Sequence, residues 1–120
     1  GIYIQYAFVR AKKLIQNSNI DVTNIDLVFS ELDETDNMLL KSFLKFDYYF
    51  NQALNNNEPH HLADFLYELS NLFNSMYQNE NILENKNEIK KFNKLKMTYY
   101  FQNYSKILMK SLGIEPAEKM

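Results

Sequence analysis

The sequence predicts an all-α protein, a bundle of four main helices, or of five if one of them breaks. Apolar residues recur at spacings of three and four over most of the chain, and no long stretch alternates with a period of two. Only 2 Gly and 2 Pro occur, too few for a turn-rich all-β domain. At 120 residues there is room for one domain with one core, and we expect residues 1–120 to form it.

The first helix is expected to begin almost at residue 2. Its apolar stripe has spacings of 4, 3 and 4 and consists of Ile4, Phe8, Ala11 and Ile15. Because neither a capping residue nor a starting Met precedes this helix, we expect the chain to be part of a longer protein. Residues 17–34 mix polar residues with short apolar pieces, which predicts a connector with at most one short helical turn.

Two further helices follow the connector. Thr35 or Asp36 can cap the second, which Asn55–Asn57 ends. Its apolar positions are Leu39, Leu40, Phe43, Phe46, Phe50 and Leu54. Pro59 suits the first position of the third helix, where its missing N–H costs nothing. The third helix has the most regular stripe, which consists of Leu62, Leu66, Leu69, Phe73 and Met76.

A long fourth helix is predicted from about Lys86 to Leu112, after an Asn-rich loop over 78–87. Its apolar positions are Ile89, Phe92, Tyr100, Tyr104, Ile107, Leu108 and Leu112. Gly113 stands where the end of a helix favours a left-handed residue, and Pro116 prevents the helix from continuing.

The charges are distributed unevenly along the chain. Residues 1–16 carry +3, residues 17–85 carry −10 and residues 86–120 carry +5, which together give the net charge of −2. If the two basic ends pack side by side, they form one positive face suited to a polyanion. The alternative is that these charges only solvate helix surfaces.

Neither a catalytic site nor a metal site is expected within this chain. There is no Cys, no Gly-rich phosphate loop and no Ser in a nucleophile motif, and no apolar run is long enough to span a membrane. His60 and His61 are adjacent, so on a helix they should point about 100° apart and be unable to share a metal. The acids Asp33, Glu34 and Asp36 precede a helix, whose dipole they favour.

A second stripe on the first helix is a candidate binding surface. Tyr3, Tyr6, Arg10 and Lys13 follow one another at spacings of 3, 4 and 3. Flat rings and a guanidinium on one exposed line can stack on unpaired bases and bond to phosphate or a base edge. Arg10 is the single Arg among thirteen basic residues, which suggests that its planar geometry matters. Alternatively, the tyrosines simply cover the core beside a surface Arg.

Three segments in order resemble a known family. They are YIQYAFVR at 3–10, EPHHLADFLYELSNLFNSMY at 58–77 and LGIEPAEKM at 112–120. Together they resemble the C-terminal anticodon-binding (DALR) domain of arginyl-tRNA synthetases over essentially the whole chain. The resemblance implies the all-α anticodon-binding bundle of a class I aminoacyl-tRNA synthetase. The family's HIGH-like and KMSKS-like catalytic motifs do not occur, and Lys96-Met97-Thr98 is not the latter.

The resemblance also implies which residues grip the anticodon loop of arginine tRNA. By motif position these are Tyr3, Arg10, Tyr77 and Met120. Two positions depart from the family pattern, because Phe8 stands where a His is usual and Lys94 where an Arg is common. Candidates for contact with the RNA backbone are Lys12, Lys13, Lys90, Lys91 and Lys94.

The implied parent is an ATP-dependent arginine–tRNA ligase of the cytoplasm. This chain would bind RNA without catalysing the reaction and would need no cofactor, since ATP and Mg would belong to the catalytic domain. Its partners would be arginine tRNA and that catalytic domain, with no membrane and as a monomer. The rival interpretations are a helical protein-interaction module, whose aromatic face docks a partner helix, and a free-standing RNA binder.

Overall fold

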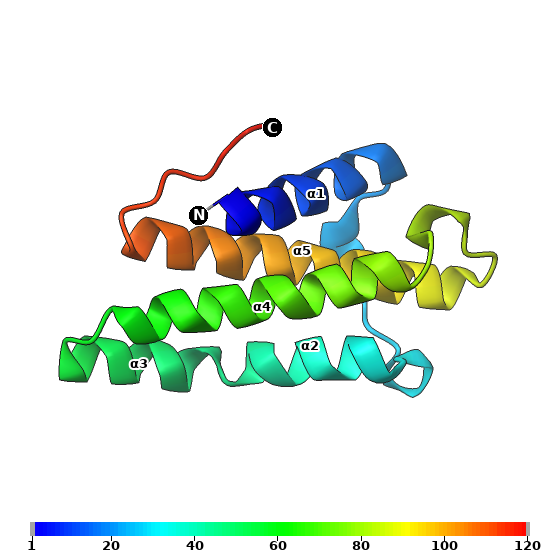
Figure 1. Cartoon of the computed structure of the whole chain (residues 1–120). Helices are drawn as coiled ribbons and strands as arrows, with labels where there is room; N and C mark the ends of the chain where they lie inside the picture. Colours follow the sequence, from blue (N-terminus) through cyan, green and yellow to red (C-terminus); the bar gives the residue numbers. More distant parts are fainter. Residues whose placement is uncertain (1, 120) are drawn as a thin grey trace.

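The computed structural model describes residues 2–119 and is built from helices (Figure 1). Its α-helices are α1 (Ile2–Ser18), α2 (Glu34–Leu44), α3 (Phe46–Asn56), α4 (His60–Asn79) and α5 (Glu88–Ser111). Three short 3₁₀ helices lie in the connections, namely η1 (Val22–Asn24), η2 (Phe29–Glu31) and η3 (Ile82–Glu84). No strand occurs among the described residues, so the prediction of an all-α bundle is confirmed.

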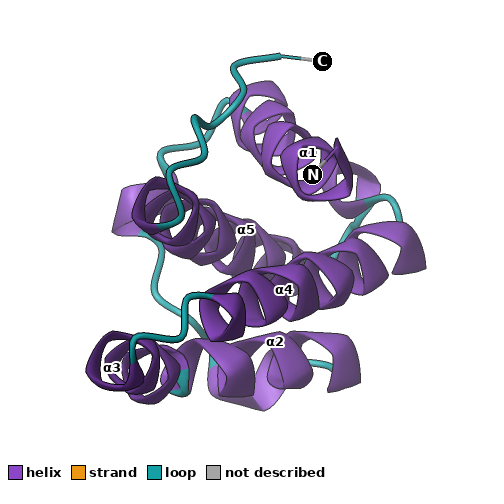
Figure 2. Ribbon diagram, turned by 60° about the vertical axis from the view of Figure 1, so that its left-hand side comes forward, coloured by secondary structure: helices purple, strands orange, loops and turns teal. Residues whose placement is uncertain are grey.

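The helices form three layers, with α5 at the centre. Figure 2 shows α1 above α4 and α5, and α2 and α3 below them. α1 runs antiparallel to α5 and packs on it more extensively than any other pair of helices does. The core fills the space between the helices, and at its centre the Phe73 ring of α4 stacks on the Phe101 ring of α5 with centroids 4.4 Å apart. This arrangement places the first and last helices, which carry the two basic ends, side by side.

The second predicted helix is divided into α2 and α3 at Lys45, which gives the fifth helix. Asp33 caps α2 rather than Thr35 or Asp36. Asp36 is instead the other half of a capping box, because its carboxylate accepts a hydrogen bond from the Asp33 N–H. The predicted apolar stripe continues through the break, except that Leu54 is 61% exposed.

The ends of α4 and α5 follow simple chain signals. α4 begins at His60, one residue later than predicted, with Pro59 in helical conformation just before it. Its five predicted stripe residues are all buried. Gly113 has φ +75° after α5, and the Ile114 N–H donates to the Met109 carbonyl over 2.7 Å. This bond and one from Gly113 to Lys110 form a Schellman motif, as the position of the glycine predicted.

The predicted pattern of α5 is partly wrong, because this helix is buried on several sides. Residues 93–98 are all buried, whereas Ile89 and Ile107 are nearly half exposed. Four of the side chains in this run are polar, and three of them, namely Asn93, Lys94 and Lys96, bind the connector 17–34. Asn93 exchanges two hydrogen bonds with the backbone of Val28, and the Lys96 ammonium donates to the carbonyl oxygens of Val22 and Thr23. The connector therefore has a defined path along α5.

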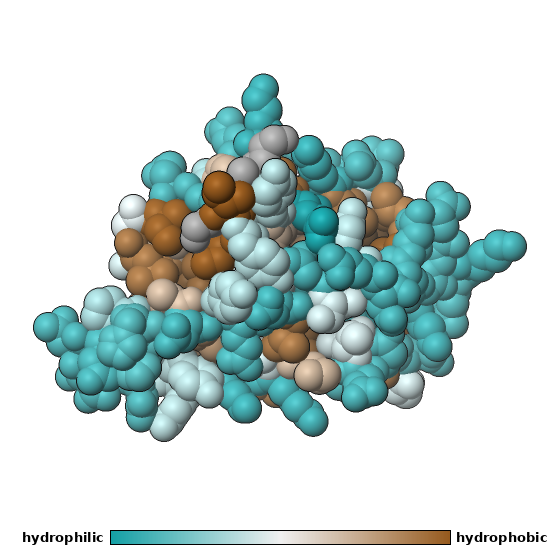
Figure 3. All heavy atoms as spheres, in the orientation of Figure 1, coloured by the Kyte–Doolittle hydropathy of each residue, from teal (hydrophilic) through white to brown (hydrophobic). Residues whose placement is uncertain are grey.

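The surface is mainly hydrophilic on the face seen in Figure 3, above all around the α3–α4 turn. Within residues 2–119, no helix is both long enough and apolar enough to cross a membrane.

Candidate functional site

A groove runs between α1 and the second half of α4. It consists of two neighbouring hollows of about 620 and 530 Å³, which share Tyr6, Arg10 and Gln78 in their walls. We call it the α1–α4 groove and define it by Tyr3, Tyr6, Arg10, Lys13, Asn71, Asn74, Tyr77 and Gln78. The second stripe of α1, predicted as a binding surface, forms one wall. A polar stripe of α4 forms the other.

Arg10 lies between the two hollows and is held by α4. Its guanidinium carbon is 4.5 Å from the centroid of the Tyr77 ring, a cation–π contact. Its Nη1 donates to Oδ1 of Asn74 over 2.9 Å. A guanidinium carries five N–H donors, and the described residues offer it this one acceptor. The fork is thus fixed in orientation and keeps donors for a ligand.

Tyr3 stands at one end of the groove. Its hydroxyl donates to Oδ1 of Asn71 over 2.6 Å, and its ring centroid is 5.4 Å from that of Tyr67. Part of the Tyr3 side chain remains accessible to a ligand, since Tyr3 is 39% exposed. Tyr6, on the same stripe of α1, is 56% exposed. Tyr77 is half-buried and packs on Phe73 in the core. The structure therefore brings Tyr3, Arg10 and Tyr77 together in one groove.

The lysines predicted to contact an RNA backbone lie in different places. Lys13 is exposed and lines the groove, and Lys12 beside it is half-exposed. Lys90 and Lys91 lie in the first turn of α5, at the end of the molecule where α1 ends. These four lysines are accessible to a polyanion, and Lys13 alone among them lines the groove.

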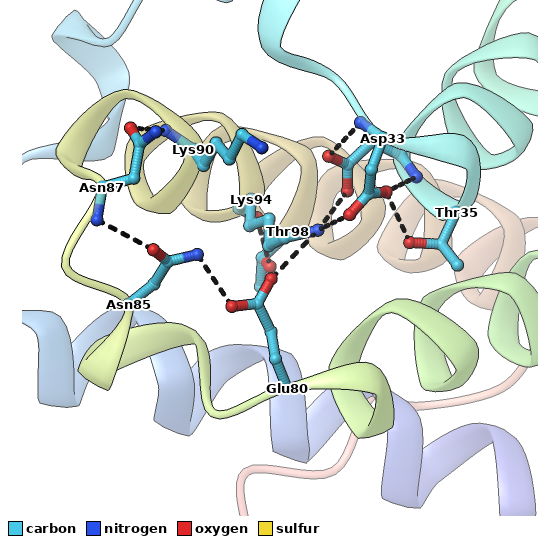
Figure 4. Close-up of polar contacts among 9 residues, drawn as sticks. Asp33, Thr35, Glu80, Asn85, Asn87, Lys90, Lys94 and Thr98 are labelled. Carbon is cyan, nitrogen blue, oxygen red and sulfur yellow. Dashed lines mark hydrogen bonds and ion pairs between the residues drawn. The ribbon is translucent and has the colours of Figure 1, made fainter.

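The prediction for Lys94 is wrong, because this lysine is 1% exposed. Its ammonium donates to Asp33 over 2.7 Å and to Asp36 over 2.9 Å, and it lies 3.6 Å from a Glu80 oxygen (Figure 4). We call Lys94, Asp33, Asp36 and Glu80 the Lys94 cluster. Since Glu80 follows the last turn of α4 and also lines the groove, the cluster fastens the end of α4 to α2 and α5.

Burial and pairing act in opposite directions on the pKa values in the Lys94 cluster. Burial alone would raise the pKa of Asp33, but hydrogen bonds from Lys94, the Asp36 N–H and Thr35 lower it to about 2. Burial raises the pKa of Asp36 despite its bond to Lys94. Burial would lower the pKa of Lys94, yet its bonds to the two aspartates outweigh this and raise it. The ammonium is therefore charged and fully engaged inside the protein.

The C-terminal tail turns back over α1 (Figure 1). The Gln5 side chain holds it by two hydrogen bonds, since its Nε2 donates to the Glu115 carbonyl over 2.9 Å and its Oε1 accepts from the Ala117 N–H over 2.8 Å. Met120, predicted to contact the anticodon, lies outside the described residues.

Sequence reasoning missed Gln5, Asn71 and Asn74. Gln5 lies within the first of the three family-like segments, at 3–10, and no pattern in the sequence assigns it a contact with the tail. Asn71, Asn74 and Gln78 are spaced by 3 and 4 on α4, and this polar stripe beside the apolar one was the signal that could have found them.

The two histidines do not lie as predicted. Their ring centroids are 4.2 Å apart, and their nitrogens lie within 4.8 Å of each other and of a Glu58 carboxylate oxygen. Adjacent Cβ atoms do point in different directions on a helix, but both side chains lie in the exposed first turn and converge over Glu58. The prediction that His60 and His61 cannot share a metal is therefore wrong, because their nitrogens lie close enough together to face one ion.

The α1–α4 groove is suited to binding rather than to covalent chemistry. Aromatic faces can stack on a planar ring, and the free donors of Arg10 and the amides of α4 can bond to its edges. Lys13 adds a positive charge at one side.

Comparisons with known proteins agree with this chemistry. Residues 4–120 match the model of the family described as the DALR anticodon binding domain. The arginine–tRNA ligase of Histophilus somni is 32% identical over 119 residues, and that of Methanopyrus kandleri 28% over 120. The ligase of Serratia proteamaculans is 27% identical over 118 residues. These alignments cover 98 to 100% of this chain but only 20 to 21% of the relatives, so the chain spans about a fifth of their length.

Proposed function

The chain belongs to the family of DALR anticodon binding domains, and from this premise we propose that it binds the anticodon loop of arginine tRNA. The observation that supports the proposal best is the convergence of Tyr3, Arg10 and Tyr77 in one groove. Two of them come from α1 and one from the end of α4, 67 residues further along the chain than Arg10. Such a groove offers ring faces and a fixed guanidinium to unpaired bases, which is how proteins read single-stranded RNA.

Binding would proceed in two parts with different physical causes. Lys12, Lys13, Lys90 and Lys91 attract the phosphate backbone, a contribution that weakens with salt and depends little on sequence. The bases of the loop then stack on Tyr3, Tyr6 or Tyr77, and each stack contributes about 1–3 kcal/mol. Hydrogen bonds from Arg10 to base edges supply the selectivity, because a planar fork fits an edge with two acceptors.

We propose that the parent protein is an arginine–tRNA ligase, because the curated relatives carry that name over a length five times greater. In such a parent the catalytic domain would hold ATP and Mg and carry out the chemistry. The groove would contribute by positioning the tRNA, since a tRNA bound at its anticodon presents its acceptor end to the catalytic domain in a defined orientation. We also propose that this parent acts in the cytoplasm, where proteins are synthesised, and that it is a monomer, since the groove is completed within one chain.

A titration tests this proposal. The purified chain is mixed with arginine tRNA and with the same tRNA carrying a swapped anticodon, each at two ionic strengths. We expect tighter binding of the native anticodon at both, and weaker binding of both RNAs at the higher ionic strength. Equal affinities for the two RNAs would contradict anticodon recognition. Binding of neither RNA at low salt would favour a protein-interaction module.

A further inference from the structure

A cluster of metal-binding side chains lies at the α3–α4 turn, far from the α1–α4 groove. Glu58, His60 and His61 each offer one potential ligand atom, and these three atoms all lie within 4.8 Å of one another. His61 Nε2 and Glu58 Oε2 are 2.5 Å apart, so two members are already in contact. Figure 3 shows this end of the molecule covered by hydrophilic residues, and His60 is exposed. An ion in solution can therefore reach the cluster.

We propose that Glu58, His60 and His61 bind one zinc ion. Two imidazoles and a carboxylate form a common ligand set for Zn²⁺, in which a water molecule takes the fourth position. Neighbouring ligand atoms around a tetrahedral zinc ion are about 3.3 Å apart, which follows from bond lengths near 2.0–2.2 Å. The His61 and Glu58 atoms are closer than this and the whole set lies within 4.8 Å, so side-chain rotations would bring the three atoms to that spacing. Ca²⁺ and Mg²⁺, which prefer oxygen ligands, fit this set poorly.

The surrounding charge is compatible with a cation. The positive end of the α4 dipole disfavours a cation in the first turn of this helix. Glu58 offsets it directly, and Asp64 lies one turn along α4 from His60. This part of the chain also lies within the acidic segment 17–85, which carries −10.

Zinc would fasten the start of α4 to the turn that precedes it. That turn contains Asn57 in a left-handed conformation, with φ 52°. Asn71 is the groove residue on α4 that is nearest in sequence to His61, and the 10 residues between them correspond to about 15 Å along the helix. The zinc site is therefore separate from the groove, and its test does not depend on the RNA proposal.

The experiment is a calorimetric titration of the untagged chain, freed of metal with EDTA, with ZnCl₂. We expect one zinc ion per chain. His60→Asn, His61→Asn and Glu58→Gln should each weaken zinc binding by about tenfold or more, since even indirect partners of metal ligands contribute 10–100-fold. Glu84→Gln, an exposed Glu-to-Gln exchange far along the chain, is the matched control and should leave zinc affinity unchanged. Far-UV circular dichroism checks that each variant is folded.

A second readout uses the fact that these are the only two histidines in the chain. In a ¹⁵N spectrum of the imidazoles, both rings should shift on addition of zinc and stop shifting at one equivalent. The proposal is overturned if zinc binds equally well to the His60→Asn/His61→Asn double variant, if one ring alone responds, or if no heat is measured. Binding of arginine tRNA by Glu58→Gln should equal that of the unchanged chain.

Discussion

Arg10 shows how one side chain gains a role from its neighbours. Alone on α1 it would be a flexible surface cation, but the Tyr77 ring and the Asn74 amide fix the plane of its guanidinium. Lys could keep the charge at this position and would lose the flat fork. The sequence pointed to Arg10 through its rarity and its spacing from Tyr3. It could not point to Asn74, because that contact depends on how α1 and α4 pack.

Replacing Arg10 tests this role. Arg10→Ala should weaken binding of arginine tRNA by about 1–3 kcal/mol, the usual cost of losing a bidentate base contact. Arg10→Lys should retain only the part of the binding free energy that depends on the positive charge. Lys41→Ala, an exposed lysine on α2, is the control and should change affinity little. A filter-binding assay measures all three. Equal small effects of Arg10→Ala and Lys41→Ala would argue against the assignment.

Gln5 is a second residue whose role depends on its neighbours, because its side chain holds the C-terminal tail. Gln5→Ala removes two hydrogen bonds to the tail backbone, each contributing about 0.5–1.5 kcal/mol. We therefore expect the Ala117 amide to exchange its hydrogen faster, while amides in the middle of α5 exchange as before. Native-state hydrogen exchange followed by NMR measures both. Unchanged protection at Ala117 would show that Gln5 does not hold the tail.

At the scale of elements, the predictions were best where a helix is buried on one face only. α4 keeps an exposed face, and all five residues of its predicted apolar stripe are buried on the opposite face. In α5, by contrast, the six consecutive residues 93–98 are all buried, because the connector packs on this helix in addition to α1, α2 and α4, so a one-sided apolar pattern could not describe it. Its buried Asn93, Lys94 and Lys96 look like surface residues in the sequence. Their partners lie 58 to 74 residues away, which no local pattern reveals.

The Lys94 cluster predicts a large effect on stability. Lys94→Met leaves the buried Asp36 carboxylate without its cation, and breaking a buried pair in this way costs about 3–5 kcal/mol. The free energy of unfolding at neutral pH, measured with urea, should fall by this amount. A loss below about 1 kcal/mol would mean that the cluster contributes little to holding α2, α4 and α5 together.

The same cluster predicts how stability depends on pH. Folding lowers the pKa of Asp33 from its ordinary value of 3.8 to about 2, so the stability that Asp33 contributes is complete above pH 3.8 and is lost as the pH falls towards 2. In Lys94→Met the pKa of Asp33 is lowered less, because one of the hydrogen bonds that lower it is missing. Protonation of the Asp36 carboxylate at low pH also removes its unpaired negative charge. The stability difference between the unchanged chain and Lys94→Met should therefore shrink from neutral pH towards pH 2. Urea unfolding across this range would contradict the account if the difference grew.

At the scale of the whole molecule, the fold packs the two basic segments of the chain against each other. α1 and α5 pack antiparallel, so the start of α5, with Lys90 and Lys91, lies at the same end of the molecule as the end of α1. The charge pattern predicted a positive face on the condition that the two basic ends pack side by side. The packing of α1 on α5 meets that condition. It also removes Lys94 and Lys96 from the surface, so fewer lysines face solvent than the sequence suggests.

Salt dependence of RNA binding tests which lysines contribute. Removing one phosphate contact lowers the slope of log affinity against log salt by about 0.7 for single-stranded RNA. We expect Lys13→Ala to produce this change, whereas Lys41→Ala should leave the slope unchanged. Equal slopes for the unchanged chain and Lys13→Ala would remove Lys13 from the interface.

The most direct test of the central claim is to map the RNA on the protein by NMR. An anticodon stem-loop of arginine tRNA is added to the isotope-labelled chain, and shifts of backbone amides and tyrosine rings are followed. The account predicts that the largest shifts fall in the α1–α4 groove, at Tyr3, Arg10, Asn74 and Tyr77. Shifts confined to the surface of α2 and α3, with the groove unaffected, would contradict it.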